Sequence, residues 1–336
     1  MGRMDGPAGH PIPAREESTR PAKPFTLHQD PMKRDLVSFA LWTPQQLGEV
    51  LAQARRLKSG TARASASLAH RSAALIFEEE SLRTRVSFEV GIAQLGGHSI
   101  FLPQESIGLA TRESVHDIGA VLSQYTNLII ARTTRHQACV QLAESARVPV
   151  INAMTDLLHP CQILADALTL QELERFNSST KIAVVGDGNN IVNSWLELAE
   201  KFPLHFVLAC PAGCEPHPQI LEQALASKVS RIEVLQDPQE AARDADVIYT
   251  DVWPLSRTGG DEGKRLALFR PYQVNRALLR LAHKDCVVMH RLPANRGEEI
   301  TGEVIDGKQS VVLRQAENRL HVQNAVMMYL LETRSD

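Results

Sequence analysis

From residue 36 onward, short apolar runs alternate with segments whose apolar residues recur at helical spacing. This alternation predicts parallel sheets, because each helix carries the chain back to begin the next strand in the same direction. Strands of such sheets are covered on both faces and are therefore apolar throughout. The chain is expected to have an α/β fold. The predicted strands are 72–77, 99–102, 127–131, 148–152, 182–185, 204–209, 232–235, 247–250 and 286–289.

The strands form two series, which a long predicted helix at 159–176 separates. At about 100–200 residues per domain, a chain of 336 residues has the length of two domains. We therefore expect two domains, each with a parallel sheet flanked by helices, joined by interdomain helices. Local signals mark some helix boundaries: Thr43-Pro44-Gln45-Gln46 predicts a helix that begins with a capping box.

The segment 1–35 differs from the rest of the chain, because it is rich in proline and has no apolar periodicity. It also lacks the apolar stretch of a secretory signal. We expect a solvated tail that becomes ordered only near 33–37, and a cytoplasmic protein.

Composition argues against several classes of function. No run of about 18 apolar residues occurs, so no membrane-spanning helix is expected. The net charge is −3 and acidic and basic residues are interspersed, which argues against a nucleic-acid binder. The five cysteines are an odd number without metal-ligand spacing. They are interpreted as reduced thiols and not as a disulfide framework or a zinc site.

The segment 81–85, Ser-Leu-Arg-Thr-Arg, follows the first predicted strand and opens a helix. A lone Ser81 at this place is usually an N-cap. Arg83 and Arg85, however, are unfavourable at the positive end of a helix dipole unless an anion binds there. Free backbone N–H groups, hydroxyls and a guanidinium predict a phosphate site, to which Arg132 after another strand adds a second guanidinium. The glutamates 78–80 either pair with Arg83 or Arg85 or face solvent.

His159 opens the long helix between the two series. A single histidine at a helix start is more often structural, but this one follows a strand opposite the predicted phosphate site. There an imidazole can donate a hydrogen bond to a carbonyl oxygen on which charge develops. Ser81 has no evident base and no Gly-x-Ser-x-Gly turn, so an acyl-enzyme is not expected.

Polar residues also follow the strands of the second series. Gly186 and Gly188 begin a dinucleotide-binding pattern, but Ile191 stands at its third glycine position and we expect no such cofactor. Asn189 and Asn190 offer amides suited to a carboxylate. Asp251 is either the partner of a substrate ammonium or a helix cap.

Taken together, the ordered motifs resemble the aspartate/ornithine carbamoyltransferase family, and ornithine carbamoyltransferase most closely. Each motif is weak alone, but their order and spacing match over about 36–333. The motifs are Ser-x-Arg-Thr-Arg (81–85), Arg-Thr (132–133), His-Pro-x-Gln (159–162), Gly-Asp-Gly-Asn-Asn (186–190), Asp-Val-Trp (251–253), His-x-Leu-Pro (290–293) and Ala-Glu-Asn-Arg (316–319).

The resemblance implies transfer of the carbamoyl group of carbamoyl phosphate to the δ-amine of ornithine. The products are citrulline and phosphate, as in arginine biosynthesis, and neither a metal ion nor a cofactor takes part. It implies a carbamoyl-phosphate domain at 36–155, an amino-acid domain at 156–315 and a C-terminal helix at 316–336 that returns to the first domain. It also implies a homotrimer whose partners are these small substrates, with no nucleic acid and no membrane.

The resemblance assigns site residues as well. Those expected to hold carbamoyl phosphate are Ser81, Leu82 through its backbone, Arg83, Thr84, Arg132, His159, Gln162, Leu292 and Arg319. Those expected to hold the amino acid are Asn190, Asp251, Ser256 and Arg257. The residues expected at the reacting groups are Arg132, His159, Asp251 and Arg291.

The sequence departs from the pattern of the ornithine enzymes at several of these places. Glu79 replaces a lysine, Leu82 a threonine and Arg291 a cysteine, and the loop 254–260 differs from the usual Ser-Met-Gly segment. An arginine at 291 would repel an ammonium and attract a carboxylate. Two alternatives therefore stay open: a carbamoyltransferase for a more acidic acceptor near Arg291 or Arg257, or an impaired paralogue that acts as a binding or regulatory protein.

Overall fold

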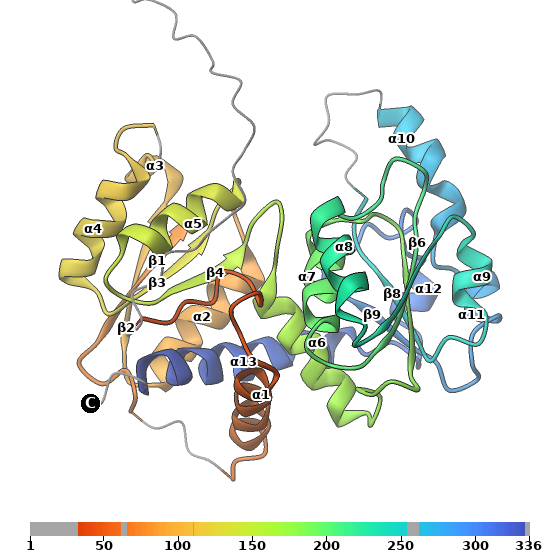
Figure 1. The fold of residues 1–336 in the computed structure, drawn as a ribbon, viewed down its shortest axis with the longest axis horizontal. Coiled ribbons are helices and arrows are strands. Elements are labelled where there is room, and N and C mark those ends of the chain that lie inside the picture. Colours follow the sequence, from red (N-terminus) through yellow and green to blue (C-terminus); the bar gives the residue numbers. More distant parts are fainter. Residues whose placement is uncertain (1–32, 62–65, 110, 254–261, 333–336) are drawn as a thin grey trace, which may run out of the picture.

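The computed structural model describes residues 33–61, 66–109, 111–253 and 262–332, which form two parallel sheets side by side (Figure 1). The first sheet has the order β2-β1-β3-β4 and the second the order β7-β6-β5-β8-β9, and neighbouring strands are parallel throughout both. The strands are β1 (Ser72–Phe77), β2 (His98–Pro103), β3 (Leu128–Arg132), β4 (Val150–Met154), β5 (Lys181–Val185), β6 (His205–Ala209), β7 (Arg231–Leu235), β8 (Val247–Thr250) and β9 (Val287–His290).

Helices cover both faces of each sheet, which confirms the predicted α/β architecture. Those of the first half are α1 (Pro44–Lys58), α2 (Leu82–Gln94), α3 (Gln104–Ile107), α4 (Val115–Tyr125) and α5 (His136–Ser145). Those that follow are α6 (Pro160–Glu172), α7 (Asn190–Ala199), α8 (Pro218–Ser227), α9 (Pro238–Ala242), α10 (Glu262–Phe269), the 3-10 turn Arg270–Tyr272, α11 (Arg276–Leu279), α12 (Gly302–Ile305) and α13 (Val312–Glu332).

Local sequence signals place several of these elements. Thr43 and Gln46 form the predicted capping box of α1, which also has Pro44 at its first turn. Strand β4 begins two residues later than predicted, beyond Pro149, which has no N–H to donate to a ladder. Ahead of β1, Leu36 bridges to Ile151 of β4. Most of the tail expected at 1–35 lies outside the described residues.

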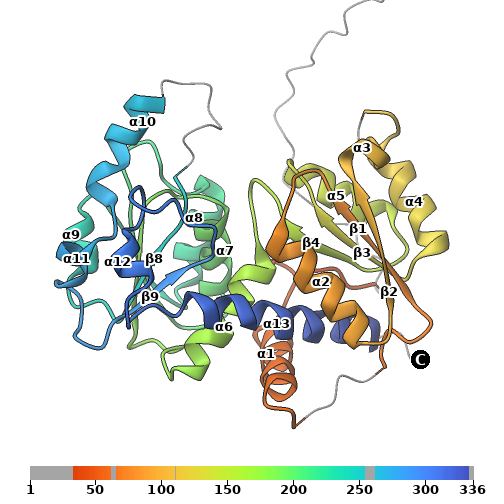
Figure 2. The ribbon, with the colours of Figure 1, turned by 180° about the vertical axis from the view of Figure 1, so that it is seen from behind.

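Two helices connect the halves. Helix α6 leaves β4 of the first sheet and leads to β5 of the second, and its residues 160–170 are buried on every side. Helix α13 begins near β9 and packs against α6, α1 and α2, so it runs from the second sheet beneath the first (Figure 2). It begins four residues before the expected start at 316, and Val312 and Gln315 of this first part are already buried against the second domain.

The main hydrophobic core continues from one half into the other, through α6, α7 and α13. Smaller cores fill the remaining faces of the first and second sheets.

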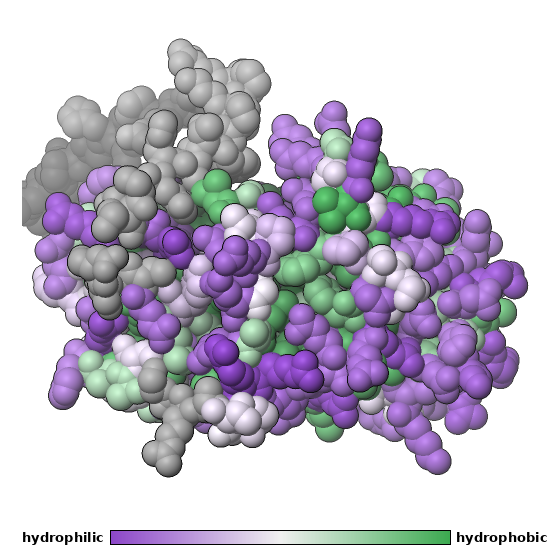
Figure 3. Space-filling model, turned by 60° about the horizontal axis from the view of Figure 1, so that its bottom comes forward, coloured by the Kyte–Doolittle hydropathy of each residue, from purple (hydrophilic) through white to green (hydrophobic). Residues whose placement is uncertain are grey.

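The face formed by the underside of the molecule is mainly hydrophilic, with hydrophobic patches near its middle (Figure 3). All five cysteines are buried and none is in a disulfide. None of the helices in the described residues has the length and apolarity needed to span a bilayer.

Candidate active site

A cavity of about 370 Å³ lies between the carboxyl ends of the two sheets. Parallel α/β sheets bind their ligands at this edge. Its walls bring together nine predicted site residues that are far apart in the sequence: Ser81, Leu82, Arg83, Thr84, Arg132, His159, Arg291, Leu292 and Arg319. The other residues of the wall are Glu80, Met154, Val252 and Pro293.

The amino end of α2 forms one wall of the cavity. Ser81 is the N-cap, and its Oγ accepts a hydrogen bond from the Thr84 N–H at 3.3 Å. The first turn of α2 contains no acidic residue, so no side chain of that turn offsets the positive end of the helix. Arg319 of α13 donates to Thr84 Oγ1 at 2.7 Å and joins this wall to the C-terminal helix. The capping role of Ser81 and a phosphate site are therefore compatible.

Four arginines face the same small volume: Arg83, Arg132, Arg291 and Arg319. Burial, together with the charges of the other three, lowers the pKa of Arg319 to about 10. Burial and the charge of Arg291 also lower the pKa of Arg83. Guanidinium groups at such close quarters repel one another, so the cavity is built to receive an anion.

Glu79 has a different partner from those that the sequence suggested. It pairs with Arg132 (Nη2 to Oε2, 3.3 Å), and not with Arg83 or Arg85. Arg85 instead pairs with Glu89 at 3.0 Å and stacks over Phe101, outside the cavity. The Glu79 side chain is about one third exposed, so water competes for its carboxylate and a bound anion can displace it.

His159 is fully buried, and its backbone N–H donates to Ser194 Oγ at 2.8 Å. Burial lowers its pKa well below the usual 6.5, and the positive charges of Arg319, Arg291 and Arg132 lower it further. The imidazole is therefore neutral at physiological pH. Its Nδ1 is buried without a hydrogen-bond partner among the described residues. A purely structural histidine would have a partner at this atom, so the functional interpretation is favoured.

Gln162 does not line the cavity but lies just behind it, one turn along α6 from His159. Its Nε2 donates to Asp166 Oδ1 at 2.8 Å, and its Oε1 is buried with no partner in the described part of the chain. Asp166 also accepts from Gln315 Nε2 of α13 at 2.7 Å, and burial raises its pKa to about 7. Sequence reasoning missed this polar link between α6 and α13, because nothing local marks residues 149 positions apart as neighbours.

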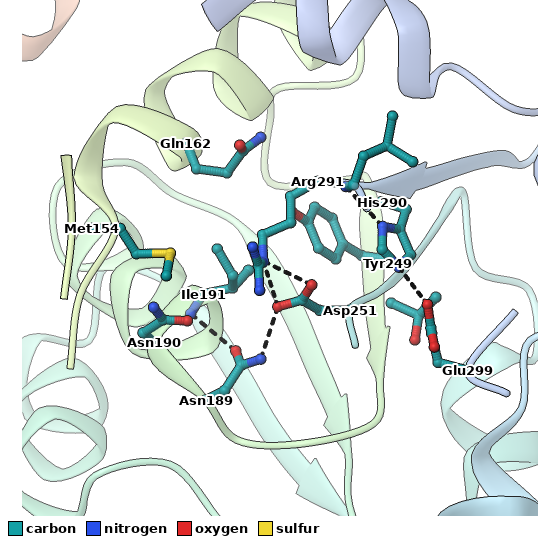
Figure 4. A network of polar contacts seen from close by, with 12 residues as sticks. Met154, Gln162, Asn189, Asn190, Ile191, Tyr249, Asp251, His290, Arg291 and Glu299 are labelled. Atoms are coloured by element: carbon teal, nitrogen blue, oxygen red, sulfur yellow. Dashed lines mark hydrogen bonds and ion pairs between the residues drawn. The ribbon is translucent and has the colours of Figure 1, made fainter. Parts of the chain in front are cut away.

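Asp251 is held by the protein itself (Figure 4). Arg291 Nε lies 2.7 Å from both carboxylate oxygens, and Asn189 Nδ2 donates to Oδ2 at 2.9 Å. The sequence did not predict this pair, and the expected roles of Asp251 with a substrate ammonium and of Arg291 with a substrate carboxylate stay predictions. Asp251 is not the cap of a described helix.

The remaining predicted residues lie outside the cavity wall. Asn190 is buried and donates to the backbone oxygen of Thr155 at 2.7 Å, which ties α7 to the segment before α6. Ser256 and Arg257 lie outside the described residues. Met154, which sequence reasoning missed, ends β4 with φ of 151° and accepts a weak hydrogen bond from Arg132 Nη1 at 3.4 Å. Its position directly at a strand end is the signal that could have found it.

In the described ranges, no group of three or more His, Cys, Asp or Glu side chains is placed to hold a metal ion. The polar groups that line the cavity are mainly hydrogen-bond donors: guanidiniums, an imidazole and the N–H groups of a helix end. Such a set stabilises negative charge on a bound ligand and on a reacting oxygen.

Comparison with known proteins agrees with this geometry. Two family models match: the carbamoyl-P binding domain of aspartate/ornithine carbamoyltransferase over 34–172, and its Asp/Orn binding domain over 178–330. The ornithine carbamoyltransferase of Chlorobaculum tepidum is 50% identical over 262 residues, which are 78% of each chain. That of Syntrophus aciditrophicus is 45% identical over 302 residues, covering 89% of this chain and all of the relative.

Solved structures show the same similarity. Ornithine carbamoyltransferase from Pyrococcus furiosus superimposes with a TM-score of 0.83 at 40% identity, covering 88% of this chain and 96% of that one. The enzyme from Thermus thermophilus gives a TM-score of 0.81 at 41% identity, covering 90% and 100%. The chain belongs to the aspartate/ornithine carbamoyltransferase family.

Proposed function

We propose that this protein transfers the carbamoyl group of carbamoyl phosphate to the δ-amine of L-ornithine, giving L-citrulline and phosphate. The observation that carries the proposal is the cavity in which the amino end of α2, Arg132, His159 and Arg319 meet, in a chain of this family. Relatives named ornithine carbamoyltransferase are up to 50% identical over most of the chain.

On the donor side, the phosphate lies against the α2 N–H groups, the hydroxyls of Ser81 and Thr84, and the guanidinium groups of Arg83, Arg132 and Arg319. Leu82 and Leu292 contribute through their backbones. These contacts suit a dianion, because charge-assisted hydrogen bonds and the helix end act on the same group. His159 is assigned to the carbamoyl oxygen, since its ring Nδ1 is buried without a partner among the described residues. Gln162 is assigned to the carbamoyl group from behind the cavity wall, where its unpartnered amide oxygen can accept from the carbamoyl N–H.

The acceptor amine has an ordinary pKa near 10.4 and must lose a proton before it attacks. Its lone pair then forms the new C–N bond at the carbamoyl carbon, and negative charge collects on the carbonyl oxygen. A neutral His159 donates a hydrogen bond to that oxygen. The bond from carbon to the bridging oxygen breaks, and phosphate leaves with the electron pair while the arginines stabilise its charge. The new amide nitrogen gives up its extra proton, which the departing phosphate takes up.

On the acceptor side, we assign the amino acid to Asn190 and Asp251, together with Ser256 and Arg257, and Arg291 to the space between the two substrates. No observation favours a more acidic acceptor, because the charge of Arg291 is neutralised by Asp251 within the protein. We further propose the domain limits given above, a cytoplasmic location and a role in arginine biosynthesis.

We also propose a homotrimer. Leu82, Val86 and Val90 expose apolar side chains every fourth residue along α2, and Ile100 does so on the neighbouring edge strand β2. Residues four apart share one face of a helix, so these side chains form an apolar stripe suited to burial against another subunit.

The proposed function is tested by incubating the purified protein with carbamoyl phosphate and L-ornithine and measuring citrulline by its colour reaction. Citrulline is expected from the wild type. Arg83→Ala should lower kcat/KM at least a hundredfold, because charge-assisted hydrogen bonds are worth about 1.5–3 kcal/mol each and a guanidinium makes more than one.

Arg296→Ala is the control, because this exposed arginine pairs with Asp306, is not part of the cavity wall, and its loss should leave activity unchanged. A carbamoylated product from another amine, but none from ornithine, would contradict the proposed acceptor. Tight binding of carbamoyl phosphate without any carbamoylated product would favour an impaired paralogue instead.

A further inference from the structure

The ion pair between Arg291 and Asp251 blocks the place at which the proposed acceptor would bind Asp251. Arg291 Nε is 2.7 Å from both oxygens of Asp251, and the two side chains are only 15% and 6% exposed. In Figure 4 the arginine side chain reaches past Tyr249 to this carboxylate. An acceptor ammonium that is to pair with Asp251 would meet a guanidinium already bound there.

The backbone on both sides of this pair is fixed. Strands β8 and β9 are neighbours with Thr250 beside His290, so the next residues of the two strands, Asp251 and Arg291, also lie side by side. The His290 ring is 3.0 Å from Glu299, and the His290 N–H donates to Gln315. Because these contacts hold the strand end in place, any opening of the pair must come from rotation of the long arginine side chain.

The same guanidinium also lines the donor cavity. Arg83, Arg132 and Arg319 repel Arg291 while no anion is bound, and the nearest acid, Asp251, attracts it. A phosphate dianion bound at the amino end of α2 places negative charge among these arginines, so this side of the cavity then attracts Arg291 instead of repelling it. The arginine then has two competing partners, one at each substrate site.

We propose that Arg291 is a specificity-determining residue that links the two substrates by exchanging partners. It pairs with Asp251 while the donor site is empty, and turns to the phosphate once carbamoyl phosphate is bound. Asp251 then becomes available to the ammonium of the acceptor. The inference rests on the proposed function, and it adds that the exchange of partners by Arg291 carries coupling between donor and acceptor binding. Because such coupling is reciprocal, the acceptor must strengthen donor binding by the same factor.

The test measures L-ornithine binding by calorimetry, with and without phosphonoacetamide. This compound replaces the bridging oxygen of the donor by a methylene group, so no transfer follows. In the wild type, the analogue should tighten ornithine binding about tenfold or more, within the usual range of coupling between sites. Arg291→Gln should bind ornithine without the analogue about tenfold more tightly than the wild type does, and the analogue should then add less than threefold.

Arg291→Lys, which keeps the charge, should retain most of the coupling, and Arg296→Gln, on an exposed ion pair, should behave as the wild type. The proposal is overturned if Arg291→Gln shows the full coupling, or if it binds ornithine more weakly without the analogue. The second outcome would mean that Arg291 holds the acceptor's carboxylate.

A wild-type crystal structure with both ligands gives a readout that needs no variant to fold. Arg291 and Asp251 should then be more than about 4 Å apart, and a pair retained at its present distance would refute the exchange. The two proposals fail separately. Coupling without citrulline would contradict the reaction alone, whereas citrulline without coupling would contradict the role of Arg291 alone.

Discussion

At the scale of single residues, Glu79 is the most unusual member of the donor site. It lies outside the cavity wall, but its carboxylate is 3.3 Å from Arg132, one of the four arginines that line the donor cavity. A phosphate must displace this carboxylate or share the arginine with it. Glu79 therefore acts as an internal competitor of the donor, and it weakens donor binding without preventing it.

Replacing Glu79 by glutamine should consequently lower the KM for carbamoyl phosphate about two- to fivefold. This range corresponds to the 0.5–1 kcal/mol expected of a partly exposed ion pair after screening by water. Steady-state kinetics at saturating ornithine measures the effect, and kcat should change less than KM. Glu89→Gln is the matched control, because Glu89 lies close by but pairs with Arg85 outside the cavity wall. An increase in KM would show that Glu79 supports the site.

At the scale of elements, the contact between α6 and α13 depends on a buried carboxyl group. Asp166 accepts hydrogen bonds from Gln162 on its own helix and from Gln315 on α13, while its Oδ2 has no partner in the described residues. Burial raises the pKa of Asp166 from 3.8 to about 7, so the folded protein holds a proton there that the unfolded chain releases. The resulting stabilisation is complete below pH 3.8 and is lost as the pH rises through about 7.

Asp166→Asn should remove this pH dependence, because the amide oxygen still accepts both hydrogen bonds and carries no charge. The free energy of unfolding of the variant should gain on that of the wild type by about 2–3 kcal/mol between pH 5 and pH 8, at 1.36 kcal/mol per pKa unit. Urea denaturation at several pH values measures the difference. Asp306→Asn, on an exposed ion pair, should show no change over this interval. Parallel curves for Asp166→Asn and the wild type would contradict the prediction.

The sequence predicts the secondary-structure elements of this protein better than the contacts between its side chains. Apolar runs predicted the nine strands of the described residues to within about two residues, because most of these strands are covered on both faces and are apolar throughout, the edge strands β2 and β7 being the exceptions. Most residues of the donor cavity were predicted because they follow strands or begin a helix, whereas Arg319, inside α13, came only from the resemblance to the family. The pairs of Arg291 with Asp251 and of Glu79 with Arg132 were not predicted, since each joins segments that only strand register and side-chain rotamers bring together.

At the scale of the whole molecule, the apolar stripe on α2 adjoins the donor site, because the same helix supplies both. Light scattering during size-exclusion chromatography should give a mass three times that of the 37.1 kDa chain. Val86→Glu should lower the mass towards that of a single chain, since a carboxylate in a subunit interface has to be desolvated. Leu313→Glu is the control, because Leu313 is 78% exposed at the start of α13, away from the stripe. A monomeric wild type, or a Val86→Glu variant of unchanged mass, would contradict the proposal.

The place of Arg319 on α13 has a consequence for how the protein is made. The amino end of α2, Arg132 and His159 are synthesised early, whereas Arg319 follows every strand of both sheets. Domains of growing chains generally fold in order from the N-terminus. The first sheet can therefore form on the ribosome long before its anion pocket is complete, and a nascent chain cannot be stabilised by the metabolite that the finished protein binds.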